Sequence, residues 1–278
     1  MTTLVIGARG AVGRHVLDQL LTAGEPVRAS VRRRATAAFP EQVSVVEADL
    51  TRPDTLKAAV HGVQKVFLYA QPGSAADFAD AACAAGVEHV VLMSSGSVLL
   101  PYAADNAITV EHREVEEALT ASGLNVTPIR PLVLANNALN WADSIRADGV
   151  VSLVHPGALM APIHERDIAA VAVAALTGTA GDKASDLLTG GELLSQRQQV
   201  ELIGQAIDTT IRVEALSMQQ ARARFAEFES PEVVEAILAF IVAAAEGGSP
   251  ATTTAQEILG HAPASFAQWA DEHADDFR

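Results

Sequence analysis

The sequence has little of what marks secreted and membrane-spanning proteins. It contains one cysteine, Cys83, which excludes an intramolecular disulfide, and the surrounding alanines predict a buried helix position rather than a reactive thiol. The longest apolar run, residues 236–245, is far too short to cross a bilayer. No basic stretch followed by an apolar core precedes the first apolar strand, so we expect no secretion signal and a cytoplasmic location.

Positive charge is also scarce. Lys and Arg number 19 against 34 Asp and Glu, which gives a formal net charge of −15 at pH 7. Such a chain repels nucleic acid and acidic membranes except at a local basic patch, so we expect neither as a partner. Apolar residues, in contrast, make up 49% of the 278 positions. That is enough for one large domain or one domain with a small appendage.

The chain opens with a strand, a glycine turn and a helix. Apolar residues 4–6 run into the sequence GARGAVG at 7–13, and apolar residues at helical spacing follow over 16–21. Three glycines at this spacing permit a tight turn, close approach of backbone N–H groups to a pyrophosphate, and close packing of helix on sheet. Such a string also arises by chance in glycine-rich chains, but its place between strand and helix favours dinucleotide binding. The residues predicted to bind are Gly7, Arg9, Gly10, Ala11, Val12 and Gly13.

The second strand indicates which dinucleotide. An NAD site usually ends this strand with an Asp or Glu, about 20 residues past the glycines, to bond the ribose 2′-hydroxyl. Here residues 26–31 form the strand and arginines follow at 32–34. A guanidinium matches a 2′-phosphate with paired, charge-assisted hydrogen bonds, and Arg9 could approach the same phosphate as Arg32. The alternative is an ordinary solvated run of charge. We therefore predict NADPH (NADP) as the cofactor.

Helices and strands then alternate. The pattern predicts strands at 43–46, 66–69, 89–93 and 125–129, and helices at 54–60, 75–85, 110–121, 165–176 and 195–207. This alternation is typical of an α/β, Rossmann-type doubly wound parallel sheet, here with a small C-terminal, mostly helical substrate lobe. We expect residues 1–131 to form the NAD(P)-binding core and 132–278 the rest of the core plus the variable lobe. The strand ends, expected to line one crevice, are Gly7, 30–32, Asp49, 70–71, 94–95 and 130–131.

Further features predict local structure rather than chemistry. Ser230 followed by Pro231 and Glu232 is a good helix start. A last helix from Ser265 carries aromatic residues that more often pack onto the body of a protein than bind a ligand. The spacing of His, Cys, Asp and Glu predicts no metal site.

Eight segments, in order, resemble the NmrA-like, atypical short-chain dehydrogenase/reductase family. They are GARGAVG (7–13), VRASVRRR (27–34), EADLTRPDTL (47–56), GVEHVVLMSS (86–95), HREVEEALTASGLNVTPIRP (112–131), APIHERDIAAVAVAAL (161–176), TGGELLSQRQQVELIGQAI (189–207) and ILGHAPASFAQWADEHADDF (258–277). The resemblance covers almost the whole chain and implies NAD(P)H bound at the strand ends, with a C-terminal lobe over the substrate. It also implies that Asp49 and Leu50 contact the adenine, Ala70 and Gln71 the ribose side, and Ser94 and Pro131 the nicotinamide end.

The resemblance also exposes a gap. In the wider superfamily a Tyr acts as the acid, and a Lys four residues later lowers its pKa and holds the ribose. Tyr102 follows the strand end at a suitable distance, but Asn106 stands at the lysine position. A phenol without a nearby cation is a poor proton relay at neutral pH, although its neutral form can still donate a proton. Tyr102 is therefore a candidate acid, and a pocket-lining aromatic residue is the alternative.

The other candidate catalytic residues, His112 and Ser95, also have structural interpretations. His112 titrates in the useful range, but Val110, Val115 and neighbouring residues take the apolar face of its helix, so it could be a surface or cap residue. Ser95 could bond a substrate carbonyl, or it could cap a turn together with Ser94. We interpret three further residues near the second half of the chain as structural: His155, His164 and Asp167.

Two functions remain open from the sequence. The first is an NADPH-dependent oxidoreductase that reduces a small, apolar carbonyl, enone or quinone by hydride transfer, with Tyr102, Ser95 or His112 as candidate catalytic residues. Hydride transfer needs mainly positioning from the protein, because the cofactor carries the chemistry. The alternative is a non-catalytic, NADP(H)-sensing regulatory protein of the NmrA type, which the missing lysine would permit. The predicted ligand is a small molecule, and the chain is a monomer or homodimer.

Overall fold

A seven-stranded sheet forms the centre of the N-terminal half. The computed structural model describes residues 1–33 and 39–278, so Arg34 lies outside the described residues. The strand order is β3-β2-β1-β4-β5-β6-β9, and each neighbouring pair is parallel. The chain winds outward from β1 to β3 and then returns to β4, so the order reverses between β1 and β4, as in a doubly wound Rossmann sheet. The predicted fold is confirmed. The strands are β1 Thr3–Val5, β2 Val27–Val31, β3 Ser44–Glu47, β4 Lys65–Tyr69, β5 His89–Met93, β6 Val126–Pro131 and β9 Leu187–Leu188.

Helices cover both faces of the sheet because its strands are apolar on both faces. Val5 and its neighbours on one face pack against α1 (Ala11–Thr22) and α6 (Glu165–Thr177). Leu4 and its neighbours on the other face pack against α2, α3 and α4. These three helices span Pro53–Val60, Ala75–Ala85 and Ala107–Ala121.

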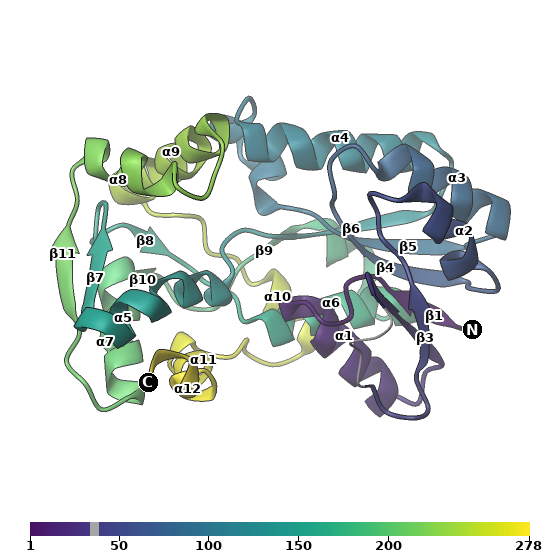
Figure 1. The fold of residues 1–278 in the computed structure, drawn as a ribbon, viewed down its shortest axis with the longest axis horizontal. Helices are drawn as coiled ribbons and strands as arrows, with labels where there is room; N and C mark the ends of the chain where they lie inside the picture. The colour runs from purple at the N-terminus through teal and green to yellow at the C-terminus, as the bar shows by residue number, and fades with distance from the viewer. Residues whose placement is uncertain (34–38) are drawn as a thin grey trace.

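The rest of the chain builds a smaller lobe (Figure 1). Two short two-stranded sheets and several helices form two apolar clusters there, while α10 returns to pack against α6. The lobe elements are α5 Ala142–Asp148, β7 Val150–Leu153, β8 Leu159–Met160, β10 Leu194–Ser195, α7 Gln196–Ala206, β11 Arg212–Ala215, α8 Met218–Phe225, α9 Pro231–Gly247, α10 Thr254–Leu259, α11 Phe266–Glu272 and α12 Ala274–Phe277. Short 3₁₀ turns lie at Gly96–Leu99, Pro101–Ala103, Ala135–Trp141 and Gly181–Ser185.

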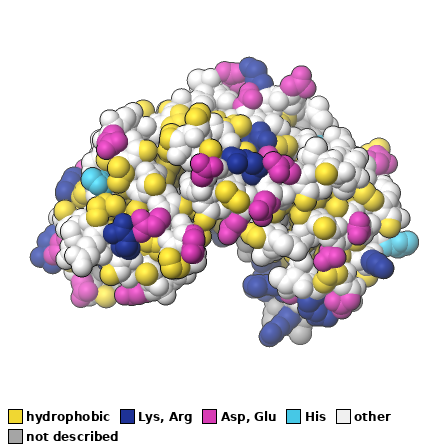
Figure 2. Space-filling view, turned by 90° about the horizontal axis from the view of Figure 1, so that it is seen from above, with side chains coloured by type: hydrophobic (Ala, Val, Ile, Leu, Met, Phe, Trp, Pro, Cys, Tyr) yellow, Lys and Arg dark blue, Asp and Glu magenta, His cyan; other side chains and the backbone are white. Residues whose placement is uncertain are grey.

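A hollow separates the sheet-bearing half from the lobe (Figure 2). The N-terminus lies at the outer end of the sheet, so the parallel strands run from it toward the lobe (Figure 1). Their carboxyl ends therefore face the lobe. Lys and Arg side chains gather on the sheet-side wall of the hollow (Figure 2).

The predicted helix start at Ser230 is confirmed, and two burial predictions are wrong. Ser230 accepts a hydrogen bond from the backbone N–H of Val233 at the start of α9. Cys83 lies on α3 as expected but is exposed, because the buried face of that helix falls on Phe78, Ala79 and Ala82 instead. Val110 is 36% exposed rather than part of the apolar face of α4. No helix in the described part of the chain has the length and apolar character needed to cross a membrane.

Candidate cofactor site at the strand ends

The glycine loop is held by its own backbone and by β2. Gly7 has φ +73°, a conformation that favours glycine. Its carbonyl accepts a hydrogen bond of 2.8 Å from the N–H of Gly10, and its own N–H donates to Oγ of the buried Ser30 at 3.3 Å. The sequence placed Ser30 at a strand end but gave no sign of this contact, since 23 residues separate the two partners.

The other two glycines differ in how much space surrounds them. A Cβ on Gly13 would lie 2.2 Å from the carbonyl oxygen of Gly7, so α1 packs onto the end of β1 only because Gly13 lacks a side chain. A Cβ on Gly10 would lie 3.2 Å from the same oxygen, which is tight but not a clash. Gly13 therefore serves close packing of helix and strand, as the motif predicts.

The N-terminus of α1 is open. Its N-cap is Gly10, which offers no side chain to the first-turn N–H groups, and the first turn holds no acidic residue. By contrast, Asn106 caps α4 and Ser195 caps α7. Uncapped N–H groups at the positive end of a helix dipole suit a phosphate. The residues of the loop thus fit the pyrophosphate of a dinucleotide.

The predicted adenosine end brings opposite charges together. Asp49 follows β3, and hydrogen bonds from the hydroxyl and N–H of Thr51 lower the pKa of its carboxyl, with a smaller contribution from the charge of Arg32. Arg32 is exposed at the end of β2. Leu50 is buried, whereas Ala70 and Gln71, directly after β4, are half-buried. These residues lie at one edge of the sheet, and their roles toward a cofactor stay a prediction.

Tyr69, the last residue of β4, is a candidate site residue that is absent from the residues predicted from the sequence. A Cβ on Gly7 would lie 3.1 Å from Cε1 of this tyrosine, so the ring lies directly against the glycine loop. Burial and the charge of Asp49 raise the pKa of its hydroxyl, while the charge of Arg32 opposes them. An aromatic residue closing the strand beside the glycine loop was the signal that could have identified it.

The predicted nicotinamide end holds a buried hydroxyl in need of a partner. Ser94 is 4% exposed, and its Oγ has no hydrogen-bond partner within the described residues. An orphaned buried hydroxyl is costly unless a ligand or water satisfies it, which fits the predicted contact with a cofactor. Pro131, also buried, ends β6 two strand-ends away from β4. Ser95, in contrast, caps the following 3₁₀ turn by accepting a hydrogen bond from the N–H of Ser97.

The candidate acids Tyr102 and His112 differ in their exposure and in their hydrogen bonds. Tyr102 lies in the 3₁₀ turn Pro101–Ala103 and is 55% exposed, and partial burial raises the pKa of its hydroxyl. Asn106, at the expected lysine position, accepts a hydrogen bond of 2.8 Å from the N–H of Thr109 and so starts α4. The ring of His112 lies 2.8 Å, through Nδ1, from the carbonyl oxygen of Ile108 on its own helix. Catalytic roles for Tyr102, Ser95 and His112 stay predictions.

Arg130 was expected to line the crevice, but its side chain is used inside the protein. Its guanidinium donates to both carboxylate oxygens of Glu116, at 2.9 and 2.6 Å, and to the carbonyl of Ser185 at 2.7 Å. Both partners of the ion pair are largely buried. The contact fixes α4 to the end of β6, which a sequence separation of 14 residues did not reveal.

A second polar assembly joins the start of α6 to the C-terminal helices, and we name it the Glu165 cluster: Arg14, His164, Glu165, Trp269 and His273. Glu165 is fully buried and accepts hydrogen bonds from Trp269 Nε1 and His273 Nε2, each at 3.0 Å. Arg14 of α1 adds an ion pair at 3.4 Å. His164 caps α6 through the N–H of Arg166, as its structural interpretation predicts. Burial alone would raise the pKa of Glu165, but the hydrogen bond from His273 and the neighbouring charges hold it below its ordinary value.

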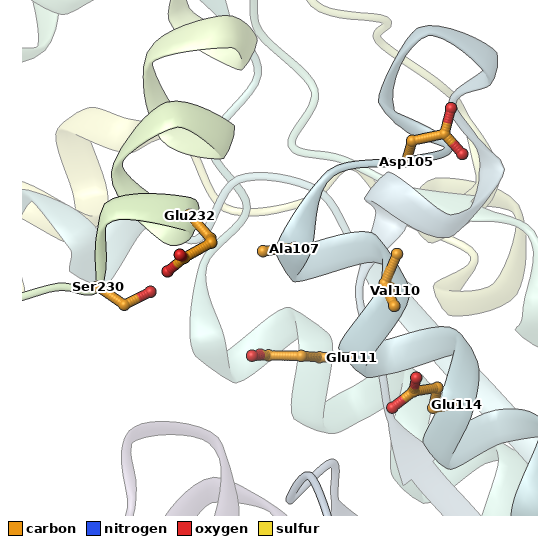
Figure 3. A pocket seen from close by; sticks show the side chains of 7 residues that line it. All are labelled: Asp105, Ala107, Val110, Glu111, Glu114, Ser230 and Glu232. Atoms are coloured by element: carbon orange, nitrogen blue, oxygen red, sulfur yellow. The ribbon is translucent and has the colours of Figure 1, made fainter.

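A separate depression of about 490 Å³ lies between α4 and the start of α9 (Figure 3). Four of its seven lining residues are acidic, and the carboxylates of Glu111 and Glu232 point into the space between the helices. Such a surface repels phosphate groups, so it does not suit an anionic dinucleotide.

Comparisons with known proteins agree with the geometry of the strand ends. Residues 7–179 match the model of a family described as NAD(P)H-binding. A (4-alkanoyl-5-oxo-2,5-dihydrofuran-3-yl)methyl phosphate reductase from Streptomyces griseus is 37% identical, covering 99% of this chain and 98% of that protein. An NAD(P)H azoreductase from Xenophilus azovorans is 30% identical over the same shares. A solved NADPH-dependent quinone oxidoreductase from Escherichia coli, complexed with NADPH, shares the fold with a TM-score of 0.78 at 21% identity, covering 98% of this chain and 99% of that one.

The family match spans well over half of the chain, and the first relative is similar along nearly all of it. The resemblance drawn from the sequence motifs is therefore confirmed. The open glycine loop of α1, at the edge where seven parallel strands end, is the place where such proteins hold their dinucleotide. This chain belongs to the NAD(P)H-binding family, in its NmrA-like, atypical short-chain dehydrogenase/reductase group.

Proposed function

We propose that this protein is an NADPH-dependent oxidoreductase that reduces a small, apolar carbonyl, enone or quinone. The observation that carries the proposal is the uncapped N-terminus of α1 with Arg32 exposed at the end of the adjacent strand β2. N–H groups there suit a pyrophosphate, and a guanidinium suits a 2′-phosphate. No carboxylate ends β2 to favour NADH instead.

The bound cofactor would supply the hydride, and the chain would supply position and a proton. The Oγ of Ser94 would hold the nicotinamide end, since its hydrogen-bonding capacity is unused. Tyr102 would donate a proton to the acceptor oxygen, because a raised pKa keeps its phenol in the neutral, donating form at pH 7. The core within 1–131 would bind the cofactor, and the lobe within 132–278 would take the substrate.

The names of two relatives support an acceptor with a polarised double bond. The relative from Streptomyces griseus is named for a dihydrofuranone that carries an alkanoyl group and a methyl phosphate, and the relative from Xenophilus azovorans is named for azo reduction. Both groups accept a hydride without the strong base that an epimerase needs, which agrees with the missing lysine of this chain.

The test is binding followed by turnover. Titration calorimetry with NADPH and NADH should show NADPH binding more tightly, and quinones and enones should then oxidise it, measured at the nicotinamide absorbance band. Arg32→Ala should weaken NADPH binding about 10- to 100-fold, the value of hydrogen bonds to a charged group, and leave NADH binding unchanged. Arg52→Ala is the matched control, since it removes a nearby exposed charge that pairs with Glu47 and Asp54. Equal losses for both cofactors in Arg32→Ala would rule out the phosphate assignment.

A second function rests on Asn106. Because this residue caps α4 where a catalytic lysine is expected, the chain could bind NADP(H) to regulate a partner rather than to reduce a substrate. Tight NADPH binding with no oxidation by any acceptor of the panel would favour this regulatory function over the reductase.

A further inference from the structure

Tyr69 occupies a place that the proposed cofactor contacts do not use. It ends β4, and β4 pairs directly with β1, whose end leads into the glycine loop. Its ring covers Gly7: a Cβ there would meet Cε1 at 3.1 Å and Cδ1 at 3.2 Å. The ring therefore lies over the end of β1, which is the strand next to β2 in the sheet.

The charges of the two neighbouring strand ends act on the phenol of Tyr69. Arg32 ends β2 and Asp49 follows β3, and both lie close enough for their charges to act on the phenol of Tyr69. Neighbouring strands are about 4.8 Å apart, so β4 and β2 are separated by about 10 Å, and the end of β1 that the ring covers lies between them. The order of strand ends across this edge is Asp49, Arg32, Gly7, Tyr69.

The hydroxyl itself is unused. It forms no hydrogen bond with any residue of 1–33 or 39–278, although the side chain is half-buried. A partly buried tyrosine usually finds a partner for its O–H group. Burial, with help from Asp49, raises the pKa of the phenol, so it remains a neutral donor at pH 7. With no partner among the described residues, the O–H group is available to donate to an acceptor of a ligand bound at these strand ends.

We propose that Tyr69 is a specificity residue for the cofactor, whose hydroxyl donates a hydrogen bond to the adenosine 2′-phosphate that Arg32 binds from the opposite side. The inference rests on the proposed use of NADPH. The phosphate would then receive hydrogen bonds from a neutral donor, Tyr69 on β4, and from a cationic donor, Arg32 on β2. It would lie between these two strand ends, above Gly7. The ring has a separate function, since it packs on Gly7 whether or not a cofactor is bound.

Tyr69→Phe tests this division, because it removes the hydroxyl and keeps the ring. The probes are adenosine 2′,5′-bisphosphate and adenosine 5′-monophosphate, which differ only in the 2′-phosphate, together with NADPH and NADH, all measured by calorimetry on the full chain. We expect Tyr69→Phe to weaken binding of the bisphosphate and of NADPH about tenfold or more, as for a hydrogen bond to a charged acceptor. Binding of the monophosphate and of NADH should change less than threefold.

The results of these titrations distinguish a failure of the Tyr69 proposal from a failure of the proposed use of NADPH. If the wild-type protein does not prefer NADPH, the use of NADPH fails and the Tyr69 proposal fails with it. If the wild type prefers NADPH and Arg32→Ala loses that preference while Tyr69→Phe keeps it, the Tyr69 proposal alone is overturned. Equal losses for both members of each probe pair would place the hydroxyl on the ribose or adenine instead and also overturn it. An unchanged melting temperature in Tyr69→Phe shows that the loop has kept its structure.

Discussion

The helices α1 and α6 pack side by side on one face of the sheet, yet they begin in opposite ways. α1 begins at Gly10 with no side-chain cap and no acid in its first turn. α6 begins at His164, which caps it, and carries Glu165 and Asp167 in its first turn. Arg14 and Glu165 bring the two first turns into contact at 3.4 Å.

The difference in capping indicates which of the two helix starts can bind a ligand. The positive end of α6 is satisfied by its own carboxylates, which in turn bind the C-terminal segment through Trp269, His273 and the N–H of Ala264. Among residues 1–33 and 39–278, no side chain caps the positive end of α1, which faces the edge where the strands end. Changes in the Glu165 cluster should therefore affect stability, and changes in the glycine loop should affect cofactor binding.

Trp269→Ala should have the largest effect. The indole is fully buried, stacks between Phe266 and His273 at centroid distances of 5.1 and 4.5 Å, and donates to Glu165. Its loss leaves a cavity and removes one hydrogen bond of the buried Glu165 carboxylate, so the free energy of unfolding, measured in urea, should fall by about 3–5 kcal/mol. Trp269→Phe keeps a ring and should cost less. A change in the ratio of NADPH to NADH affinity in the folded variant would contradict the separation of the two regions.

Gly13→Ala and Gly10→Ala should separate packing from binding within the loop itself. A Cβ on Gly13 would meet the backbone of Gly7 at 2.2 Å, so α1 must shift, which costs about 1–3 kcal/mol and misplaces the loop. A Cβ on Gly10 has more room and should cost less than about 1 kcal/mol, but it obstructs the approach of the pyrophosphate. We expect both variants to lose NADPH affinity in calorimetry and only Gly13→Ala to lose thermal stability. Full NADPH affinity in Gly10→Ala would move the pyrophosphate away from this turn.

The sequence predicts these two regions unequally for a physical reason. The strand and helix periodicity is local, so the helix at 75–85 and the strand at 89–93 match the structure residue for residue. The glycine loop is also a local motif, as is the serine that caps α9. α4 begins three residues before the predicted start, because the side-chain cap at Asn106 sets its first residue and the apolar periodicity does not.

Contacts between residues that are far apart in the sequence have no local pattern of this kind. Glu165 and Trp269 are 104 residues apart, and neither has a pattern that names the other. Arg130 looked like a crevice residue because it ends a strand, and only the fold shows that Glu116 holds it. The strand pattern places Tyr69 at the end of β4, but it does not show that its ring packs on Gly7.

The smallest expected effect concerns the pH dependence of the Glu165 cluster. The hydrogen bond to Glu165, followed by that to Asp276, raises the pKa of His273 despite its burial. A raised native pKa means that the folded protein holds this proton more tightly than the unfolded chain. The resulting stabilisation is complete below pH 6.5, the ordinary value for histidine, and is lost as pH rises through the raised pKa. Glu165 has the opposite effect. Because its pKa is lowered in the native state, it stabilises the folded protein above pH 4.5, and this stabilisation is lost as pH falls through the native pKa.

His273→Gln tests this sign, because glutamine keeps a hydrogen-bond donor but does not titrate. Between pH 6 and 9 the free energy of unfolding of the wild type should fall by about 1 kcal/mol more than that of the variant, a value typical of a solvent-screened ion pair. Subtracting the pH profile of the variant's unfolding free energy from that of the wild type cancels the contributions of other titrating groups. These include His15, whose pKa is lowered by burial. Parallel curves would mean that His273 is neutral in the native state. NADPH affinity should follow the same pH course in both proteins, because the proton that His273 holds stabilises the closed start of α6 and not the open start of α1.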